Sequence, residues 1–279
     1  MTAIGLYLSH PVTWVMFVLG ALIGSFLNVV IFRVPDGEFF KHSRSRCRSC
    51  GSMIPIYLNI PIASYVLLRG RSSCCQEKLS LQYPLVELGL GLAFSFIYWR
   101  FPFVSLDGGA LIYNAPNFLR FFHAATFTSL MVVCSVIDMR HMIIPDVISI
   151  PMICLVPVVA YFHPDLDIWS AVWGVLLGGG SLYLVAWVYW LIRREVGLGL
   201  GDVKLLAAIG GWLGYQAIMP TVFVGSILGA VWGVSLMLIS RKGSLKTAIP
   251  FGPFLSVGAL IHLFFSNRLR EFLFYLSQS

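Results

Sequence analysis

Residues 168–192 read IWSAVWGVLLGGGSLYLVAWVYWLI and contain no charged side chain. A transmembrane helix needs about 20 predominantly apolar residues to cross the hydrocarbon core of a bilayer. This stretch is therefore predicted to span a membrane. Its glycine run at 178–180 predicts a close helix contact or a bend, because small residues let membrane helices approach each other.

Seven other stretches have a similar apolar character, although those at 83–99 and 203–219 are short. Only 11% of the 279 residues are charged and 58% are hydrophobic, whereas a soluble domain has about 25% charged residues. The sequence therefore predicts an all-α polytopic membrane protein with about eight transmembrane helices. The predicted spans are 11–32, 83–99, 118–137, 143–162, 168–192, 203–219, 220–240 and 248–265.

The distribution of Lys and Arg predicts the orientation. If the 33–82 loop is cytoplasmic, the inner segments contain fifteen of these residues and the outer segments four, which agrees with the positive-inside rule. Both termini then lie outside, and the first span is a retained anchor because no basic n-region precedes it. The predicted regions are a first helix at 1–32, a cytoplasmic cysteine loop at 33–82 and a seven-helix core at 83–279. The net charge of +7 is attributed to the basic residues of the predicted cytoplasmic segments, and nucleic-acid binding is the less favoured explanation of it.

Acidic residues in or against the predicted spans are candidate functional residues, because an ionisable group in a bilayer is costly. Asp138 ends the third span in SVIDMRHMIIPD, and Asp202 opens the sixth in GLGLGDVKLLAAIG. The predicted topology places both at the cytoplasmic face. Two carboxylates at one depth can share a proton, with one acting as base toward water and the other as acid toward the leaving group.

The alternative for each aspartate is a structural role, either as a helix cap or as the partner of a base such as Arg140 or Lys204. In these two contexts we favour the catalytic interpretation. Gly199 and Gly201 flank the approach to Asp202, where they would let an extended substrate backbone come near.

Two other acidic residues receive weaker interpretations. Asp146 follows Pro145 at a predicted helix start, which favours a capping or positioning role. Glu87 lies within the second span, where a structural hydrogen bond and a substrate-facing role both remain open.

The predicted cytoplasmic loop contains Cys47 and Cys50 in a CxxC motif, followed by the adjacent pair Cys74 and Cys75. A disulfide is disfavoured in the cytoplasm, and two cysteine pairs at this separation suit a tetrahedral zinc site. Adjacent cysteines are poor geometry for one ion, so His42 is a possible substitute ligand. Unmetallated thiols are the alternative.

Taken together, these motifs make the chain resemble the type IV prepilin leader peptidases, which combine a GxGD intramembrane aspartyl protease with an N-methyltransferase. The resemblance covers nearly the whole length. The GxGD motif at 199–202 is weak alone but specific when paired with the upstream ID…IPD segment. The segments that carry the resemblance are GSFLNVVIFRVP at 24–35, the CxxC loop, NIPIASYVLLRGR at 59–71, YPLVELG at 83–89, IDMRHMIIPD at 137–146, GLGLGDVKLLAAIGGWLG at 197–214 and IPFGPFLSVGA at 249–259.

The resemblance implies that Asp138 and Asp202 are the catalytic pair. It implies cleavage of the basic leader of a prepilin or pseudopilin at the cytoplasmic face of a bacterial inner membrane. It also implies that the new N-terminal residue is then methylated with S-adenosylmethionine as the methyl donor. We assign substrate positioning to the neighbouring residues Gly199, Gly201, Asp146 and Lys204.

The resemblance also implies a zinc site made by two CxxC pairs, but here Ser72 stands where the first cysteine of the second pair is expected. Cys75 keeps the other position and Cys74 is additional. No glycine-rich fingerprint locates the methyl donor, so the cysteine loop together with Glu87 is the hypothesis for that site.

Three competing functions differ from this expectation. One is a GxGD protease without methyltransferase activity. The second is a proton-coupled transporter, since membrane carboxylates also relay protons. The third is a non-enzymatic zinc-loop assembly factor, which would leave the two aspartates without a role.

Overall fold

The computed structural model describes residues 11–37, 39, 46–47, 49–107, 110–195, 199–239 and 249–278. His42, the substitute zinc ligand considered above, lies outside these residues. The chain divides into two compact units, Met1–Ser129 and Leu130–Ser279. The division falls inside helix α5 (Ala115–His141).

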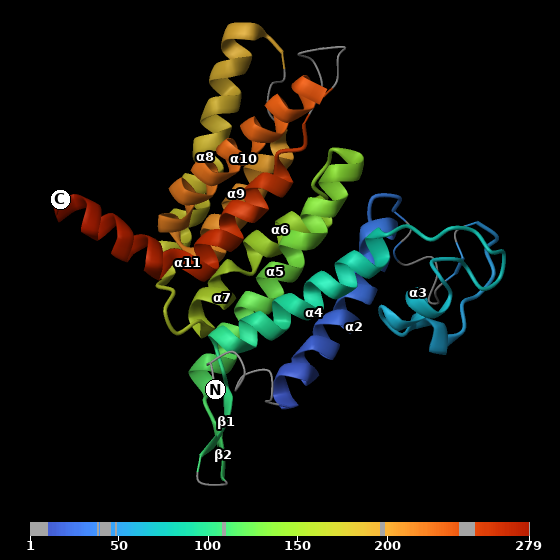
Figure 1. Ribbon diagram of the computed structural model, residues 1–279. Helices are drawn as coiled ribbons and strands as arrows, with labels where there is room; N and C mark the ends of the chain where they lie inside the picture. The colour runs from blue at the N-terminus through green and yellow to red at the C-terminus, as the bar shows by residue number, and fades with distance from the viewer. Residues whose placement is uncertain are drawn as a thin grey trace. The chain divides into compact units, whose positions relative to one another are not determined.

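The first unit is built on two helices, α2 (Pro11–Arg33) and α4 (Gln82–Arg100), which pack along each other (Figure 1). Their backbones approach closely because glycines line the contact. A Cβ at Gly24 would lie 2.8 Å from the Cα of Glu87, and one at Gly91 would lie 2.9 Å from the ring of Phe17. Small residues at such positions allow dense van der Waals packing between membrane helices.

Short elements fill the connections of this unit. The segment between α2 and α4 contains the 3-10 turn η1 (Ile56–Asn59) and the five-residue helix α3 (Ala63–Leu67). Between α4 and α5, strands β1 (Val104–Asp107) and β2 (Ala110–Tyr113) form an antiparallel hairpin that the sequence did not predict. Apart from this hairpin, the named elements are helices.

The second unit contains the rest of the helices. Helices α8 and α9 pack most tightly, with Gly174 of α8 against Gly210 of α9 and Gly178 against Leu206. Residues Leu205 to Trp212 of α9 are all buried. The elements are α6 (Asp146–Cys154), α7 (Val156–Phe162), α8 (Ile168–Arg193), α9 (Leu200–Leu213), η2 (Tyr215–Ala217), α10 (Ile218–Ile239) and α11 (Gly252–Gln278).

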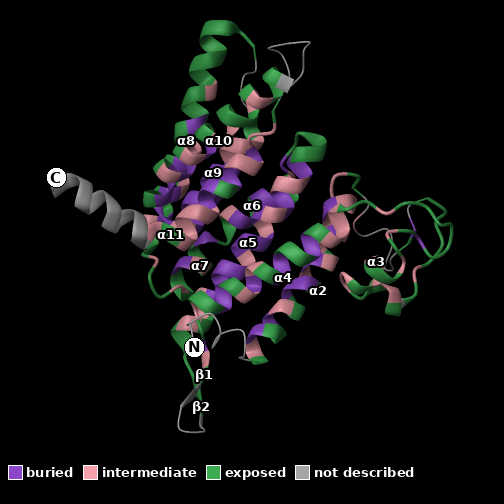
Figure 2. Ribbon diagram, in the orientation of Figure 1, coloured by how far each residue is buried: buried purple, intermediate pink, exposed green. Residues whose placement is uncertain are grey.

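Among the described residues, four helical segments are long and apolar enough to cross a bilayer: Pro11–Arg33, Ala115–His141, Ile168–Arg193 and Tyr215–Leu238. Much of α8 is exposed (Figure 2). Its exposed residues include large apolar ones such as Trp173, of which 53% is exposed. Since a large exposed apolar surface is unfavourable in water, these side chains are suited to contact lipid.

The other predicted stretches differ in detail from their observed helices. The stretch at 143–162 is interrupted at Leu155, between α6 and α7, with Pro151 inside the first helix and Pro157 in the first turn of the second. The predicted boundary between the spans 203–219 and 220–240 lies earlier in the structure. Helix α9 ends at Leu213, and Gly214 caps it with a positive φ of 85°. Because α9 has 14 residues, it is only about 21 Å long.

Candidate functional site

Asp138 lies in the last turn of α5 and is buried, with 5% of its surface exposed. Its Oδ2 accepts a hydrogen bond of 2.9 Å from the backbone N–H of Gly252, the first residue of α11. The first N–H groups of a helix have no partner within the helix, and they carry partial positive charge. The N-terminus of α11 therefore holds the Asp138 carboxyl group.

The chain reverses directly after Asp138. Helix α5 ends at His141, and Met142 adopts a left-handed φ of 54°. Pro145 then precedes α6 in an extended conformation, as expected for a residue that cannot donate a backbone hydrogen bond. This turn brings Ile144 against the glycines of two other helices: a Cβ at Gly201 would lie 3.1 Å from its Cβ, and one at Gly252 would lie 3.3 Å from its Cδ1.

Asp202 occupies the first turn of α9 and is partly buried. Its N–H donates to the carbonyl of Gly199 over 3.1 Å, which closes the first turn. The carboxylates of Asp138 and Asp202 are near enough for their charges to interact. The structure therefore brings together the two acidic residues that the sequence singled out, 64 positions apart along the chain.

The two flanking glycines have different surroundings. A Cβ at Gly199 would lie 3.6 Å from Oδ2 of Asp202, whereas Gly201 meets Ile144. The contact of Gly201 is thus with this chain's own segment, which lets the N-terminus of α9 lie against the turn that follows Asp138.

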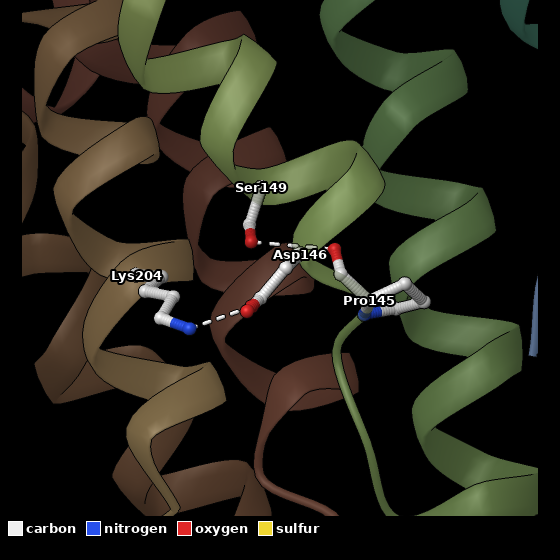
Figure 3. Close-up of polar contacts among 4 residues, drawn as sticks. All are labelled: Pro145, Asp146, Ser149 and Lys204. Atoms are coloured by element: carbon white, nitrogen blue, oxygen red, sulfur yellow. Dashed lines mark hydrogen bonds and ion pairs between the residues drawn. The ribbon is translucent and has the colours of Figure 1, made fainter.

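Lys204 and Asp146 form an ion pair. Along the sequence, Asp146 follows Asp138 and Lys204 follows Asp202. The Lys204 Nζ lies 2.6 Å from Oδ1 of Asp146 (Figure 3). The Lys204 side chain is partly exposed and that of Asp146 is exposed. Asp146 is the first residue of α6, where Ser149 also bonds back to the carbonyl of Pro145 over 3.3 Å. The ion pair links α6 to α9. Of the two roles expected for Asp146, capping is wrong, because Pro145 is the N-cap of α6 and Asp146 is the first residue inside the helix. A positioning role stays a prediction.

The four loop cysteines converge in the first unit. The Sγ atoms of Cys47, Cys50, Cys74 and Cys75 all lie within 4.8 Å of one another. The separations are 3.6 Å between Cys47 and Cys75 and 3.2 Å between Cys50 and Cys74. Tetrahedral zinc with Zn–S bonds of about 2.3 Å places its sulfurs about 3.8 Å apart, so this donor set fits a structural zinc ion.

Hydrogen bonding also favours the thiolate form of one of these cysteines. The Ser72 side chain, followed by backbone groups of Cys50, lowers the pKa of Cys47 to about 6. The thiolate is the form that binds metal, and the lowered pKa of Cys47 favours that form.

Glu87 lies in α4 and is buried. Its Oε2 accepts a hydrogen bond of 2.7 Å from the backbone N–H of Ile62, which precedes α3 and has a positive φ of 61°. Of the two roles left open from sequence, this contact supplies a structural one.

Comparison with known proteins places the chain in a family. A model of the Bacterial Peptidase A24 N-terminal domain matches residues 18–101, and one of the Type IV leader peptidase family matches residues 125–234. The prepilin leader peptidase/N-methyltransferase of Stutzerimonas stutzeri is 33% identical over 96% of each chain. This chain belongs to the type IV prepilin leader peptidase/N-methyltransferase family. The resemblance seen in the sequence is thereby confirmed.

Other members of this prepilin leader peptidase family are similarly related. Those of Pseudomonas putida and Neisseria gonorrhoeae are each 34% identical, over 90% and 88% of this chain. No solved structure matches the chain. The protein is thus a multi-pass membrane protein of a bacterial enzyme family.

Sequence reasoning did not identify Gly252 as a partner of Asp138. The sequence indication for this residue is the segment IPFGPFLSVGA at 249–259, which carries part of the family resemblance but assigns no role to any single residue. Its glycine matters because a Cβ there would lie 2.7 Å from Oδ2 of Asp138.

Proposed function

We propose that Asp138 and Asp202 are the catalytic pair of a prepilin leader peptidase. The observation that carries this proposal is the convergence of two helix ends that each carry a carboxylate. Asp138 lies in the last turn of α5 and Asp202 in the first turn of α9, and Ile144, which follows α5, packs against Gly201 of α9. Two like charges so placed favour a state in which one proton is shared between them. Such a pair provides a base and an acid at one site.

In this proposal, the ionised carboxylate removes a proton from a water molecule, and the resulting hydroxide adds to the scissile carbonyl carbon. The protonated carboxyl then donates its proton to the amide nitrogen as the C–N bond breaks. The products are a leader with a free carboxylate and a pilin with a new amino terminus. The hydrogen bond from Gly252 to Asp138 fixes one carboxyl group for this chemistry.

We infer that the substrate is a prepilin or pseudopilin, since the relatives carry the name prepilin leader peptidase. A basic leader held in the cytoplasm would present its junction at the inner face of the inner membrane. The proposed topology has eight spans, with both termini outside, the cysteine loop at 33–82 inside and the peptidase core at 83–279. The helices α4, α6–α7, α9 and α11 would complete the four segments already long enough to cross.

The second proposed activity is N-methylation of the new amino terminus, because the relatives are named N-methyltransferases. S-adenosylmethionine would supply the methyl group when bound. The candidate region remains the cysteine loop with Glu87, where the hydrogen bond to Ile62 ties that loop to α4. Zinc held by the four cysteines would order the loop without taking part in the reaction.

One experiment separates these activities. The purified full-length protein is incubated with a prepilin and S-adenosylmethionine, and the intact mass of the product is measured. Loss of the leader together with the gain of one methyl group supports both activities, whereas loss of the leader alone supports a protease without methyltransferase activity. Uncleaved prepilin would reject the proposal, and a liposome proton-flux assay would then test the transporter alternative.

Variants assign the activity to the two aspartates. Asp138→Asn and Asp202→Asn should each abolish cleavage while the protein still inserts into membranes. Asp167→Asn is the matched control, because Asp167 caps α8 through bonds to Trp169 and Ser170, and Asn is an equally good cap. Substantial cleavage by either catalytic variant would overturn the assignment.

A further inference from the structure

The first CxxC motif is held in a turn with a specific backbone pattern. Arg46 and Met53 pair as an antiparallel bridge that closes the turn. Inside it, the Cys47 N–H donates to the carbonyl of Ser52 over 2.8 Å, and the Gly51 N–H donates to the carbonyl of Cys47 over 2.9 Å. Gly51 has a left-handed φ of 72°.

The same pattern recurs around the second cysteine pair. Arg71 and Lys78 form the closing antiparallel bridge. The Ser72 N–H donates to the carbonyl of Glu77 over 2.8 Å, and the Gln76 N–H donates to the carbonyl of Ser72 over 3.0 Å. Gln76 has a left-handed φ of 59°, although it is not a glycine.

The two turns therefore correspond position by position, with counterparts 25 residues apart. Ser72 is the counterpart of Cys47, and Cys75 is the counterpart of Cys50. The second turn thus lacks a cysteine at its first position. Its other cysteine, Cys74, corresponds to Ser49.

The side chain of Cys74 nevertheless reaches the cluster. Its Sγ lies 3.2 Å from that of Cys50, while Cys75 approaches Cys47 at 3.6 Å. The Ser72 Oγ lies 2.9 Å from the Cys74 Sγ and 3.4 Å from the Cys47 Sγ. Ser72 and Cys47 are both buried, so the hydroxyl lies between two sulfurs rather than in solvent.

We propose that the fourth zinc ligand of this chain lies at the third position of the second turn, so that Cys74 coordinates the metal and Ser72, at the first position, supports it. The inference rests on the proposed zinc site. Zinc prefers thiolate to a neutral hydroxyl, which favours Cys74 over Ser72 as the ligand. The Ser72 O–H donates its one hydrogen to the sulfur of Cys74 or Cys47, and such a partner orients a ligand and tunes it.

Cobalt substitution tests the proposal without using enzyme activity. The full-length protein is loaded with Co²⁺, and the sulfur-to-cobalt charge-transfer absorption, which rises with the number of bound thiolates, is measured. Cys74→Ser should remove about a quarter of this absorption, as expected for one of four ligands. Ser72→Ala should keep the full absorption but weaken metal binding by about 10–100-fold.

A double variant makes the test independent of simple destabilisation. Ser72→Cys combined with Cys74→Ser places the fourth thiol at the counterpart of Cys47, and should restore the four-thiolate absorption. Cys154→Ser, which changes an exposed cysteine in α6, is the control and should match the unmodified protein.

The outcomes are distinct. Full charge-transfer absorption in Cys74→Ser would show that Cys74 is not a ligand and would overturn the inference while leaving the zinc site in place. Failure of the unmodified protein to bind cobalt would reject the zinc site and the inference together. Neither result bears on prepilin cleavage, which the product mass measures separately.

Discussion

The backbone N–H of Gly252 donates a hydrogen bond to Oδ2 of Asp138 over 2.9 Å, joining the start of α11 to the end of α5. The same glycine leaves no room for a side chain, because a Cβ would lie 2.7 Å from that oxygen. Gly252 therefore both binds the carboxyl group and allows it to approach. In the proposed mechanism, this contact sets the orientation of one of the two catalytic aspartates.

Gly252→Ala should consequently reduce prepilin cleavage. The added methyl group forces Asp138 or the start of α11 to shift, and a displacement of about 1 Å at a reacting group can cost on the order of 100-fold in rate. Initial cleavage rates of the purified variants give the measurement. Gly180→Ala in α8 is the control, since a Cβ added at Gly180 would have nothing within 4 Å. Equal rates for Gly252→Ala and the unmodified protein would show that the contact has no role in cleavage.

The ion pair between Lys204 and Asp146 leads to a second prediction. The Lys204 side chain is partly exposed and that of Asp146 is exposed, so the pair should contribute no more than about 1 kcal/mol to the free energy of unfolding. It nevertheless connects α6, the helix that follows Asp138, to α9, the helix that carries Asp202. Lys204→Gln and Asp146→Asn should therefore each lower kcat for cleavage several-fold while changing the unfolding temperature little.

A double-mutant cycle with the Lys204→Gln/Asp146→Asn protein checks whether the two residues act as a pair. If they do, the double variant should lose no more activity than either single variant. Losses that multiply would mean that the residues act separately, for example through independent contacts with substrate. A fall in unfolding temperature that parallels the loss of kcat would indicate a purely structural role.

The sequence predicted much of this site because its strongest features are local. Acidic residues are conspicuous in a chain with so few charges, and the segments around Asp138 and Asp202 place each one at a helix end. Gly252 gave no comparable indication, since its contact with Asp138 joins positions 114 residues apart. Hydropathy does not reveal which helix N-terminus faces a given carboxyl group.

Two other features of the structure could not be predicted from sequence because they depend on backbone geometry. The end of α9 at Gly214 follows from a left-handed φ of 85°, within a stretch that stays apolar through the next helix. The correspondence of Ser72 with Cys47 rests on matching backbone hydrogen bonds. Cysteine spacing indicated a metal site but did not establish that Cys74 reaches the other sulfurs.

Glu87 provides a third prediction. Its carboxylate accepts a hydrogen bond of 2.7 Å from the backbone N–H of Ile62. Ile62 adopts a positive φ, which is energetically costly for a β-branched residue. Glu87→Ala should release the segment from η1 to α3, whereas Glu87→Gln keeps an acceptor oxygen and should release it less. Limited proteolysis followed by mass measurement would report faster cutting between residues 56 and 67.

The same variants test the proposed methyl-donor region. If Glu87 and the cysteine loop serve methylation, Glu87→Ala should reduce methyl incorporation while prepilin cleavage continues. Unchanged methylation in a variant whose 56–67 segment has become protease-sensitive would separate the loop from that activity. Loss of both activities would indicate a general effect on the first unit.

The packing of α8 on α9 gives a fourth prediction. A Cβ at Gly178 would lie 2.5 Å from the carbonyl oxygen of Leu206, in a contact made of backbone rather than flexible side chains. Gly178→Ala should therefore push the two helices apart and lower the free energy of unfolding by about 1–3 kcal/mol, the usual cost of overpacking. Gly180→Ala, on an open part of the same helix, should change it far less.

This packing should also affect catalysis, because α9 begins at Leu200 and carries Asp202 in its first turn. Displacing α9 moves that carboxylate relative to Asp138, so Gly178→Ala should lower the cleavage rate at temperatures where the protein remains folded. Thermal unfolding in detergent and cleavage rates measured on one preparation give the comparison. A destabilised Gly178→Ala protein with a normal rate would mean that α9 can shift without moving Asp202 away from its partner.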